Sequence, residues 1–134
     1  MCQGDYMDKQ MTALAKLFQA LADPTRLRIL GLLLAGEVCV CEIHDTLRIP
    51  QSKASRHLAY LRRAGLVATR REGVWVHYRQ TDTPDAVAAT IRQAVAHGLG
   101  HLEIVQRDGQ RLQKKTGCCA PPQPGQPAFA CCAP

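Results

Sequence analysis

The sequence predicts a mainly α-helical domain with one small β-hairpin. Aliphatic residues recur at helical spacing along most of the chain, which is typical of amphipathic helices. Only 4% of the residues are aromatic although 46% are hydrophobic, so aliphatic side chains on helices must supply the core. Alternation typical of β-strands is confined to residues 66–80.

We expect one folded domain over residues 7–115, because 134 residues leave little room for a second domain. Residues 1–6 are predicted to be a flexible N-terminus. Residues 116–134 are rich in Pro, Gly and Cys and lack periodicity, so they are predicted to be a disordered tail. No signal peptide is visible, and no apolar run approaches the ~20 residues of a membrane span. We therefore expect a cytoplasmic protein without a membrane partner.

Two helices are expected in the first 35 residues. Residues 7–21 carry an apolar stripe. Asp23 followed by Pro24 provides an N-cap and a proline at the first helical position, so a second helix is predicted over 24–35. This segment is apolar on most sides and should be central to the core. Gly36 is expected to end it.

A third, short helix is predicted over residues 38–47, followed by a tight turn at residues 48–50 and a fourth helix over 51–64. Gly65 stands where a left-handed residue would close the fourth helix. The fourth helix has a narrow apolar face and a cationic remainder. Two helices with a short turn, the second exposing cations, predict a helix-turn-helix.

Residues 66–71 and 74–80 are predicted to form a hairpin that turns at Glu72-Gly73. A basic hairpin directly after the fourth helix makes the fold a winged helix-turn-helix. Thr83-Pro84 repeats the capping signal, and one long helix is expected from there to about residue 115, giving about five helices plus the wing. The first and last helices carry more apolar surface than a small domain buries. This excess predicts a homodimer formed through those two helices.

The positive charge is concentrated in the centre of the chain. Residues 48–79 carry eight basic and one acidic residue, a net of +7, whereas the flanking segments carry −2 and +1. Such a segment is either a footprint for nucleic acid or a solvated surface helix. In a recognition helix, Gln51 and Arg56 suit base edges. The remaining candidates are Ser52, Lys53 and Ser55 for phosphates, His57 and Tyr60 for DNA or for packing against a neighbouring helix, and Arg70, Arg71 and Arg79 of the wing for backbone or minor groove.

Seven cysteines fall in clusters, as expected for ligands or redox groups in a reducing compartment. Cys39 and Cys41 lie two residues apart, about 200° on an ideal helix, so they can hold one ion only where a helix starts or is distorted. Thiolates select soft ions. The alternative is a pair of small buried core residues. The vicinal pairs Cys118-Cys119 and Cys131-Cys132 either capture thiophilic ions or are exposed thiols without that role.

Residues 10–105 resemble the ArsR/SmtB family of winged-helix metalloregulators. The matching pieces are LADPTRLRILGLL, EVCVCEI, QSKASRHLAYLRRAGLV and REGVWVHYR. The resemblance implies a homodimeric repressor that binds palindromic double-stranded operator DNA when apo and dissociates on binding metal or metalloid. The CVC box with a following acidic residue resembles the arsenite-responsive branch, which implies As(III) or Sb(III) as inducer. No organic cofactor is expected, and the absence of a nucleophile–base constellation predicts a protein that is not an enzyme.

Arsenite-responsive members often carry a third cysteine three residues after the second, where this chain has His44. The site is therefore completed by water or hydroxide, by Cys2, or by Cys118 or Cys119 of the tail. A Cd(II)/Pb(II)-responsive repressor and a thiol-redox switch are the alternative functions. A second family site lies on the last helix, where Asp85 is present but Val87 stands in place of the first expected histidine. His97 and His101 could share a face and bind Zn(II), but two of the four expected ligands fail, so ordinary polar positions are favoured.

Overall fold

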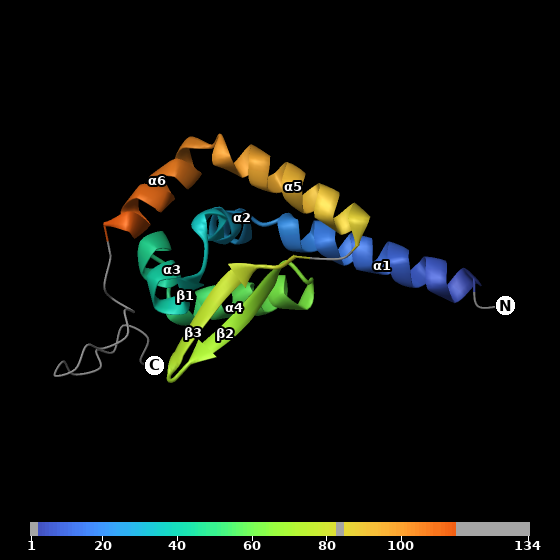
Figure 1. Cartoon of the computed structure of the whole chain (residues 1–134), viewed down its shortest axis with the longest axis horizontal. Coiled ribbons are helices and arrows are strands. Elements are labelled where there is room, and N and C mark those ends of the chain that lie inside the picture. Colours follow the sequence, from blue (N-terminus) through green and yellow to red (C-terminus); the bar gives the residue numbers. More distant parts are fainter. Residues whose placement is uncertain (1–2, 83–84, 115–134) are drawn as a thin grey trace.

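The computed structural model describes residues 3–82 and 85–114, with the side chains from residue 7 onward. These ranges contain six α-helices and a three-stranded antiparallel sheet at one side of the helical body, which confirms the winged helix-turn-helix fold class (Figure 1). The elements are α1 (Gln3–Leu21), α2 (Pro24–Leu32), a 3₁₀ turn η1 (Leu33–Ala35), β1 (Val38–Cys39), α3 (Val40–Leu47), α4 (Gln51–Arg63), β2 (Val67–Glu72), β3 (Trp75–Gln80), α5 (Ala86–Gly100) and α6 (Glu103–Gln113).

The first two helices follow their predicted signals. The α1 helix begins at Gln3, four residues before its predicted start. Asp23 caps α2, since its carboxylate accepts from the N–H groups of Thr25 at 2.9 Å and Arg26 at 3.1 Å. Gly36 ends this segment with φ +138°, a value that favours glycine.

The predicted third helix is partly wrong, because its first two residues are a strand. Val38 and Cys39 form β1, which pairs antiparallel with β3 in the register Val38 with Tyr78 and Cys39 with His77. The helix α3 begins only at Val40. A long-range pairing with the hairpin therefore overrides the helical pattern of the local sequence.

The helix-turn-helix and the hairpin form as predicted. Arg48 in the turn adopts a left-handed conformation with φ 56°, and Gly65 follows α4 with φ 80°. The hairpin β2–β3 turns at Gly73, whose φ is 63°. Together β2 and β3 form the wing, which projects away from the helical body (Figure 1).

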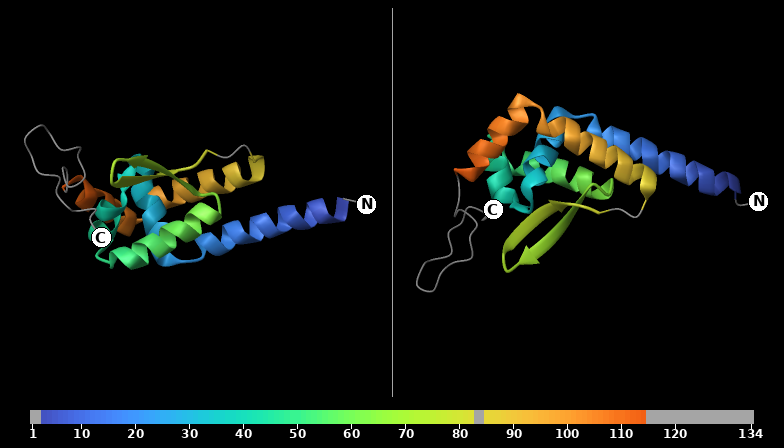
Figure 2. Two further views of the ribbon diagram at one scale, coloured as in Figure 1. Left: turned by 90° about the horizontal axis from the view of Figure 1, so that it is seen from below. Right: turned by 45° about the horizontal axis from the view of Figure 1, so that its top comes forward.

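The predicted single C-terminal helix is wrong, because the chain breaks after Gly100. The α5 helix is capped by Asp85, whose carboxylate accepts from Val87 N–H at 3.1 Å, and it closes at His101. The chain then turns into α6, which folds back over α2 and α3 (Figures 1 and 2). The expected capping pair at residues 83–84 lies outside the described residues.

The α6 helix is anchored against α2 by close packing and by a buried ion pair. Val105 lies so near Gly31 that a β-carbon there would sit 2.7 Å from a valine methyl. Asp108, 2% exposed, accepts two hydrogen bonds of 2.9 Å from Arg28. Arg111 donates to the carbonyl of Thr46 in α3 at 2.8 Å. These contacts fix α6 to the first helix of the helix-turn-helix.

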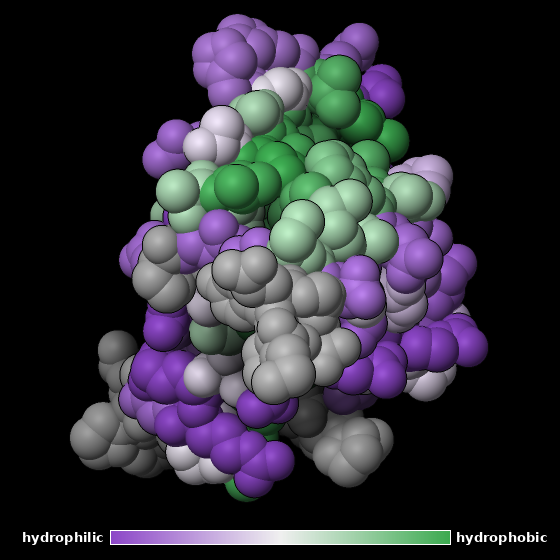
Figure 3. Space-filling model, turned by 90° about the vertical axis from the view of Figure 1, so that its right-hand side faces the viewer, coloured by the Kyte–Doolittle hydropathy of each residue, from purple (hydrophilic) through white to green (hydrophobic). Residues whose placement is uncertain are grey.

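Several large apolar side chains of α1 and α5 are exposed. Met7, Met11, Phe18 and Val87 are between 53% and 66% exposed. Figure 3 shows hydrophobic side chains gathered on the face at this end of the molecule. Met11 and Val87 also line a groove of about 560 Å³ between α1 and the start of α5. No helix among the described residues is long and apolar enough to cross a membrane.

Candidate thiol site and nucleic-acid interface

Cys39 and Cys41 converge at the point where α3 begins. Cys39 is the extended N-cap residue of α3, whereas Cys41 belongs to the first turn. Their sulfur atoms lie 3.3 Å apart, and the residues are 2% and 1% exposed. Because β1 ends at Cys39 and α3 starts at Val40, the helix begins between the two cysteines, as one shared ion would require.

The separation of the sulfurs would allow one thiophilic ion to contact both. With metal–thiolate bonds of about 2.3 Å, two sulfurs that share an ion can lie at most ~4.6 Å apart, and the observed distance is 3.3 Å. The pair could therefore supply two ligands to a soft ion.

Glu42 completes the start of α3. Its carboxylate accepts a hydrogen bond from the backbone N–H of Cys39, which is half of a capping box. Burial raises the pKa of Glu42 above its ordinary value, while nearby His77 and the Cys39 N–H oppose that rise. Glu42 thus ties the backbone of one cysteine to the helix that carries the other.

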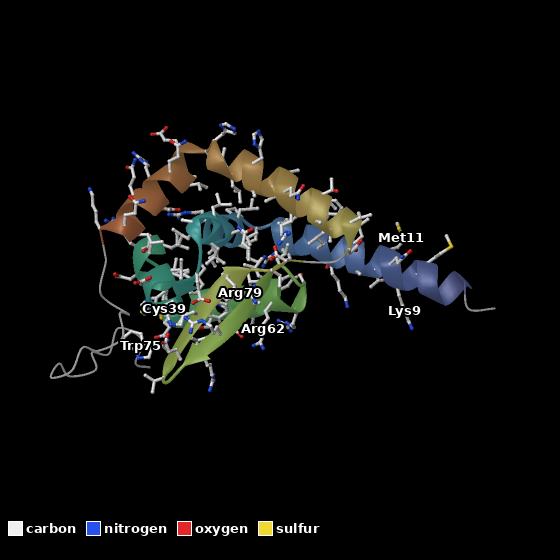
Figure 4. The ribbon with its side chains drawn as sticks, viewed as in Figure 1. Lys9, Met11, Cys39, Arg62, Trp75 and Arg79 are labelled. Carbon is white, nitrogen blue, oxygen red and sulfur yellow. The ribbon has the colours of Figure 1, made fainter. Side chains whose placement is uncertain are left out.

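The cysteine pair is also joined to the wing. Cys39 pairs with His77 of β3 in the sheet. Just before β1, Glu37 receives hydrogen bonds from Arg70 of β2, the shortest at 2.6 Å, and these lower the pKa of Glu37. Figure 4 shows Cys39 where α3 meets the wing, at the opposite end of the molecule from Met11.

The cysteines expected to complete the site lie outside the described residues. His44 is half-buried on α3, one turn beyond Cys41. Cys2, Cys118, Cys119, Cys131 and Cys132 all lie outside the ranges that the structure describes. Within those ranges, no group of three or more His, Cys, Asp and Glu residues is placed to hold a metal ion.

The N-terminal part of α4 presents its polar side chains to solvent. Ser52, Lys53, Ser55 and Arg56 are exposed, and Gln51 is half-buried at the first position. The N-cap is Pro50, and over the described part of the chain no side chain accepts from the first N–H groups of α4. The positive end of the helix therefore faces outward between side chains suited to phosphates.

His57 and Tyr60 face α2 rather than open solvent. Burial lowers the pKa of His57, and Asp23 opposes this while Arg26, Lys53 and Arg56 add to it. The guanidinium carbon of Arg26 lies 4.2 Å from the centre of the Tyr60 ring. This arrangement favours the packing alternative for both side chains.

The three arginines of the wing differ in their surroundings. Arg70 is held by Glu37 and, at 3.3 Å, by Glu72. Arg71 and Arg79 are exposed, and neither has an ion pair within the described residues. The two unpaired cations are better placed than Arg70 to meet a phosphate backbone.

The candidate residues of the second site are only partly brought together. The rings of His97 and His101 meet edge to face, with their centres 4.8 Å apart. Asp85 lies at the other end of α5 as its N-cap. The two histidines therefore have no contribution from Asp85 on the same chain.

Three functional contacts were missed from the sequence. Glu42 at the third helical position was a possible capping signal, but a cysteine N-cap falls outside the usual box. Glu37 and Arg26 act through tertiary contacts with Arg70 and Tyr60, for which no local signal exists.

Comparisons with known proteins show which family this chain belongs to. Residues 23–69 match the family model described as bacterial regulatory protein, arsR family. A transcriptional regulator of Methanocaldococcus jannaschii is 49% identical over 69 residues, which cover 51% of this chain and 78% of the relative. The chain belongs to the ArsR family. Members of this family are transcriptional regulators, which agrees with the expectation that the chain is not an enzyme.

Two further relatives of this ArsR-family chain have names that mention arsenic. The arsenic resistance transcriptional regulator ArsR1 of Pseudomonas putida is 48% identical over 82 residues, 59% of this chain and 63% of the relative. The arsenical resistance operon repressor of Escherichia coli is 51% identical over 77 residues, 57% of this chain and 66% of the relative. The chain thus spans slightly less than two thirds of each of these two proteins.

A solved structure supports the fold assignment. A homodimeric winged helix-turn-helix DNA-binding domain of Mycobacterium bovis, described as a possible ArsR-family regulator, superposes with a TM-score of 0.60 at 34% identity. The match covers 75% of this chain and 94% of that one. The reduced form of HlyU from Vibrio cholerae gives a TM-score of 0.58 at 35% identity, over 72% of this chain and 98% of that one.

Proposed function

We propose that this protein is a metalloid-responsive transcriptional repressor in the cytoplasm. As a homodimer it binds palindromic operator DNA when apo, and it dissociates when As(III) or Sb(III) binds to Cys39 and Cys41. The observation that carries this proposal is the convergence of the two sulfurs, 3.3 Å apart, at the start of the helix-turn-helix.

The choice of a trivalent metalloid rests on the cysteine geometry and on the relatives. The two sulfurs lie 3.3 Å apart, close enough for one soft thiophilic ion to contact both. The two arsenic-resistance relatives share about half of their aligned residues with this chain. We assign the third position to Cys118 or Cys119 of the tail, with Cys2 or a bound hydroxide as alternatives.

The DNA interface is proposed to consist of α4 and the wing. Exposed Arg56 and half-buried Gln51 would read base edges, and Ser52, Lys53 and Ser55 would hold phosphates. Arg71 and Arg79 would meet the backbone beside the major groove. In a two-fold dimer the operator then consists of inverted half-sites about one helical turn apart.

The dimer is proposed to cover the exposed apolar side chains of α1 and α5. Their exposure together with the groove of about 560 Å³ between the two helices leaves an apolar surface that a second copy would bury. The homodimeric Mycobacterium bovis neighbour gives this arrangement a precedent.

Coupling between the two sites follows from the shared elements. An ion bound to both sulfurs would link the end of β1, which carries Cys39, to the first turn of α3, which carries Cys41, and any shift on binding would pass to both elements. The start of α3 leads into the turn before α4, and β1 pairs with the wing. Such coupling is typically about 1–3 kcal/mol, so we expect operator affinity to fall by about 5- to 150-fold at saturating arsenite.

Fluorescence anisotropy with a labelled operator tests the proposal. We expect arsenite to release the wild-type protein, while Cys39→Ser and Cys41→Ser bind DNA in the apo state but no longer respond. Thermal unfolding of both variants checks that they are folded. Operator binding that persists at saturating arsenite would refute the metalloid response. Stronger release by Cd(II) or Pb(II) than by arsenite would identify one of those ions as the inducer instead. X-ray absorption at the arsenic edge, on the full chain and on a chain ending at Lys115, counts the sulfur ligands.

A thiol-redox switch is the second candidate. The short distance between the sulfurs favours it, since thiol–disulfide exchange requires neighbouring sulfur atoms and those of Cys39 and Cys41 lie 3.3 Å apart. Release by peroxide in the absence of metalloid, reversed by dithiothreitol and lost in Cys39→Ser, would support this alternative.

A further inference from the structure

Arg26 of α2 contacts both α1 and α4 with its side chain. Its backbone N–H donates to the N-cap carboxylate of Asp23, which fixes it in the first turn of α2. Its Nε donates to the carbonyl of Ala20 at 2.7 Å and its Nη2 to the carbonyl of Gln19 at 2.9 Å. The same guanidinium lies over the ring of Tyr60 in α4, 4.2 Å from its centre.

The contacts with α1 are those expected of a helix C-cap. The carbonyls of Gln19 and Ala20 belong to the last turn of α1, where the unsatisfied acceptors and the helix dipole favour a cation. A planar guanidinium can donate along its edge while stacking its face on an aromatic ring. Arg26 therefore connects the end of α1 to the third turn of α4 through two hydrogen bonds and one cation–π contact.

We infer that Arg26 is the positioning residue that fixes α4 relative to α1 and thereby sets the half-site spacing that the dimer accepts. This inference rests on the proposed function, in which α1 lies in the dimer interface and α4 in the major groove. The two recognition helices are then separated by a path that runs from α4 through Tyr60 and Arg26 into α1 and on to the partner copy.

The physical consequence is a penalty for operators of the wrong length. Inserting one base pair moves one half-site by about 3.4 Å and rotates it by about 35°. A rigid connection between α4 and α1 resists this displacement, whereas a loose one adapts to it. Arg26 should therefore affect the ratio of affinities between spacings more than the affinity for the best spacing.

A neighbouring arginine supplies a matched control. Arg63 also approaches the Tyr60 ring, with its guanidinium carbon 5.9 Å from the ring centre. Its Nε, however, contacts the carbonyl of Ala59 within the same helix at 3.4 Å. Arg63 thus has the same charge and the same aromatic neighbour, but among the described residues it donates no hydrogen bond to α1.

The test starts from a palindromic operator selected from random DNA by the apo wild-type protein. Dissociation constants are then measured for that operator and for versions with the spacer one base pair shorter or longer. For Arg26→Ala we expect the penalty for a changed spacer to be about three- to tenfold smaller than for the wild type, because a cation–π contact and two hydrogen bonds are lost. Arg63→Ala should weaken binding to all three operators by the same factor.

Two more variants separate positioning from folding and charge. Arg26→Lys keeps the charge but cannot both stack and donate twice, so it should also relax the spacing ratio. Tyr60→Leu leaves the Arg26 contacts with α1 in place and should give the same relaxation. A spacing ratio equal to that of the wild type in Arg26→Lys and Tyr60→Leu would overturn the inference while leaving the proposed repressor intact. Failure of the wild type to select any DNA would overturn the proposed function and the inference with it.

Discussion

The two ends of the helix-turn-helix differ in how firmly they are held. At the cysteine end, α3 is joined to β1, to the wing and to α6, and both cysteines are almost fully buried. At the proposed DNA-facing end, the first turn of α4 carries exposed side chains and no side-chain cap among the described residues. A ligand at the cysteine end would therefore contact packed structure, whereas a ligand at α4 would meet exposed side chains. This difference makes the cysteine end suited to switching and α4 suited to recognition.

The largest effect is expected from removing the anchor of α6. In Arg28→Leu, the carboxylate of Asp108 stays buried without its cation, which should lower the free energy of unfolding by about 3 kcal/mol, at the lower end for buried pairs because Arg28 is partly exposed. Urea unfolding at fixed protomer concentration measures this. Arg107→Leu on the same helix breaks only an exposed pair with Glu103 of 3.9 Å and should cost less than about 0.5 kcal/mol. Equal losses in both variants would show that the Arg28–Asp108 pair is not the anchor of α6.

A smaller effect, on binding alone, is expected at α4. Arg56→Ala should weaken binding to the selected operator by about 5- to 150-fold, as for the loss of a bidentate base contact, and leave the melting temperature unchanged because Arg56 is exposed. Lys53→Ala should instead weaken binding to all sequences alike and reduce the slope of log affinity against log salt by about one per protomer. Identical sequence profiles for the two variants would contradict the proposed division between base and phosphate contacts.

The smallest effect is expected where the two ends meet, at the wing. Glu37→Gln weakens the hold on Arg70 and leaves an additional cation for the DNA backbone, so operator affinity should rise by no more than about fivefold, the equivalent of an exposed ion pair. The salt dependence should steepen at the same time. Glu103→Gln removes the same charge from α6, far from the wing, and serves as control. A rise of the same size in the control would point to net charge rather than to Arg70.

Local signals predicted the parts of the fold that depend on neighbouring residues. Asp23 and Pro24 start α2, Gly36 ends its 3₁₀ extension and Gly65 follows α4, each through backbone geometry that the residue type itself favours. The concentration of cations over residues 48–79 likewise indicated the surface of α4 and the wing. These features could be predicted because their physical cause lies within a few residues.

The remaining features depend on contacts between distant segments. The strand β1 is only two residues long and exists because β3 pairs with it. The break between α5 and α6 lets Val105 reach Gly31 and Asp108 reach Arg28, which no local pattern announces. The sequence indicated that Cys39 and Cys41 can hold one ion only where a helix starts or is distorted. The start of the helix between them depends on β1 ending at Cys39, which the sequence did not predict. The ligand set and the DNA contacts stay predictions.

The first turn of α4 has no side-chain cap among the described residues, because its N-cap residue is Pro50. A capping side chain there would stabilise the free protein by about 1 kcal/mol. In the proposed complex a phosphate oxygen of the DNA would accept hydrogen bonds from the first backbone N–H groups of α4 in place of a capping side chain. Part of the operator affinity would then come from stabilising the start of α4. A variant with a capping side chain at position 50 should be a more stable protein that binds the operator more weakly.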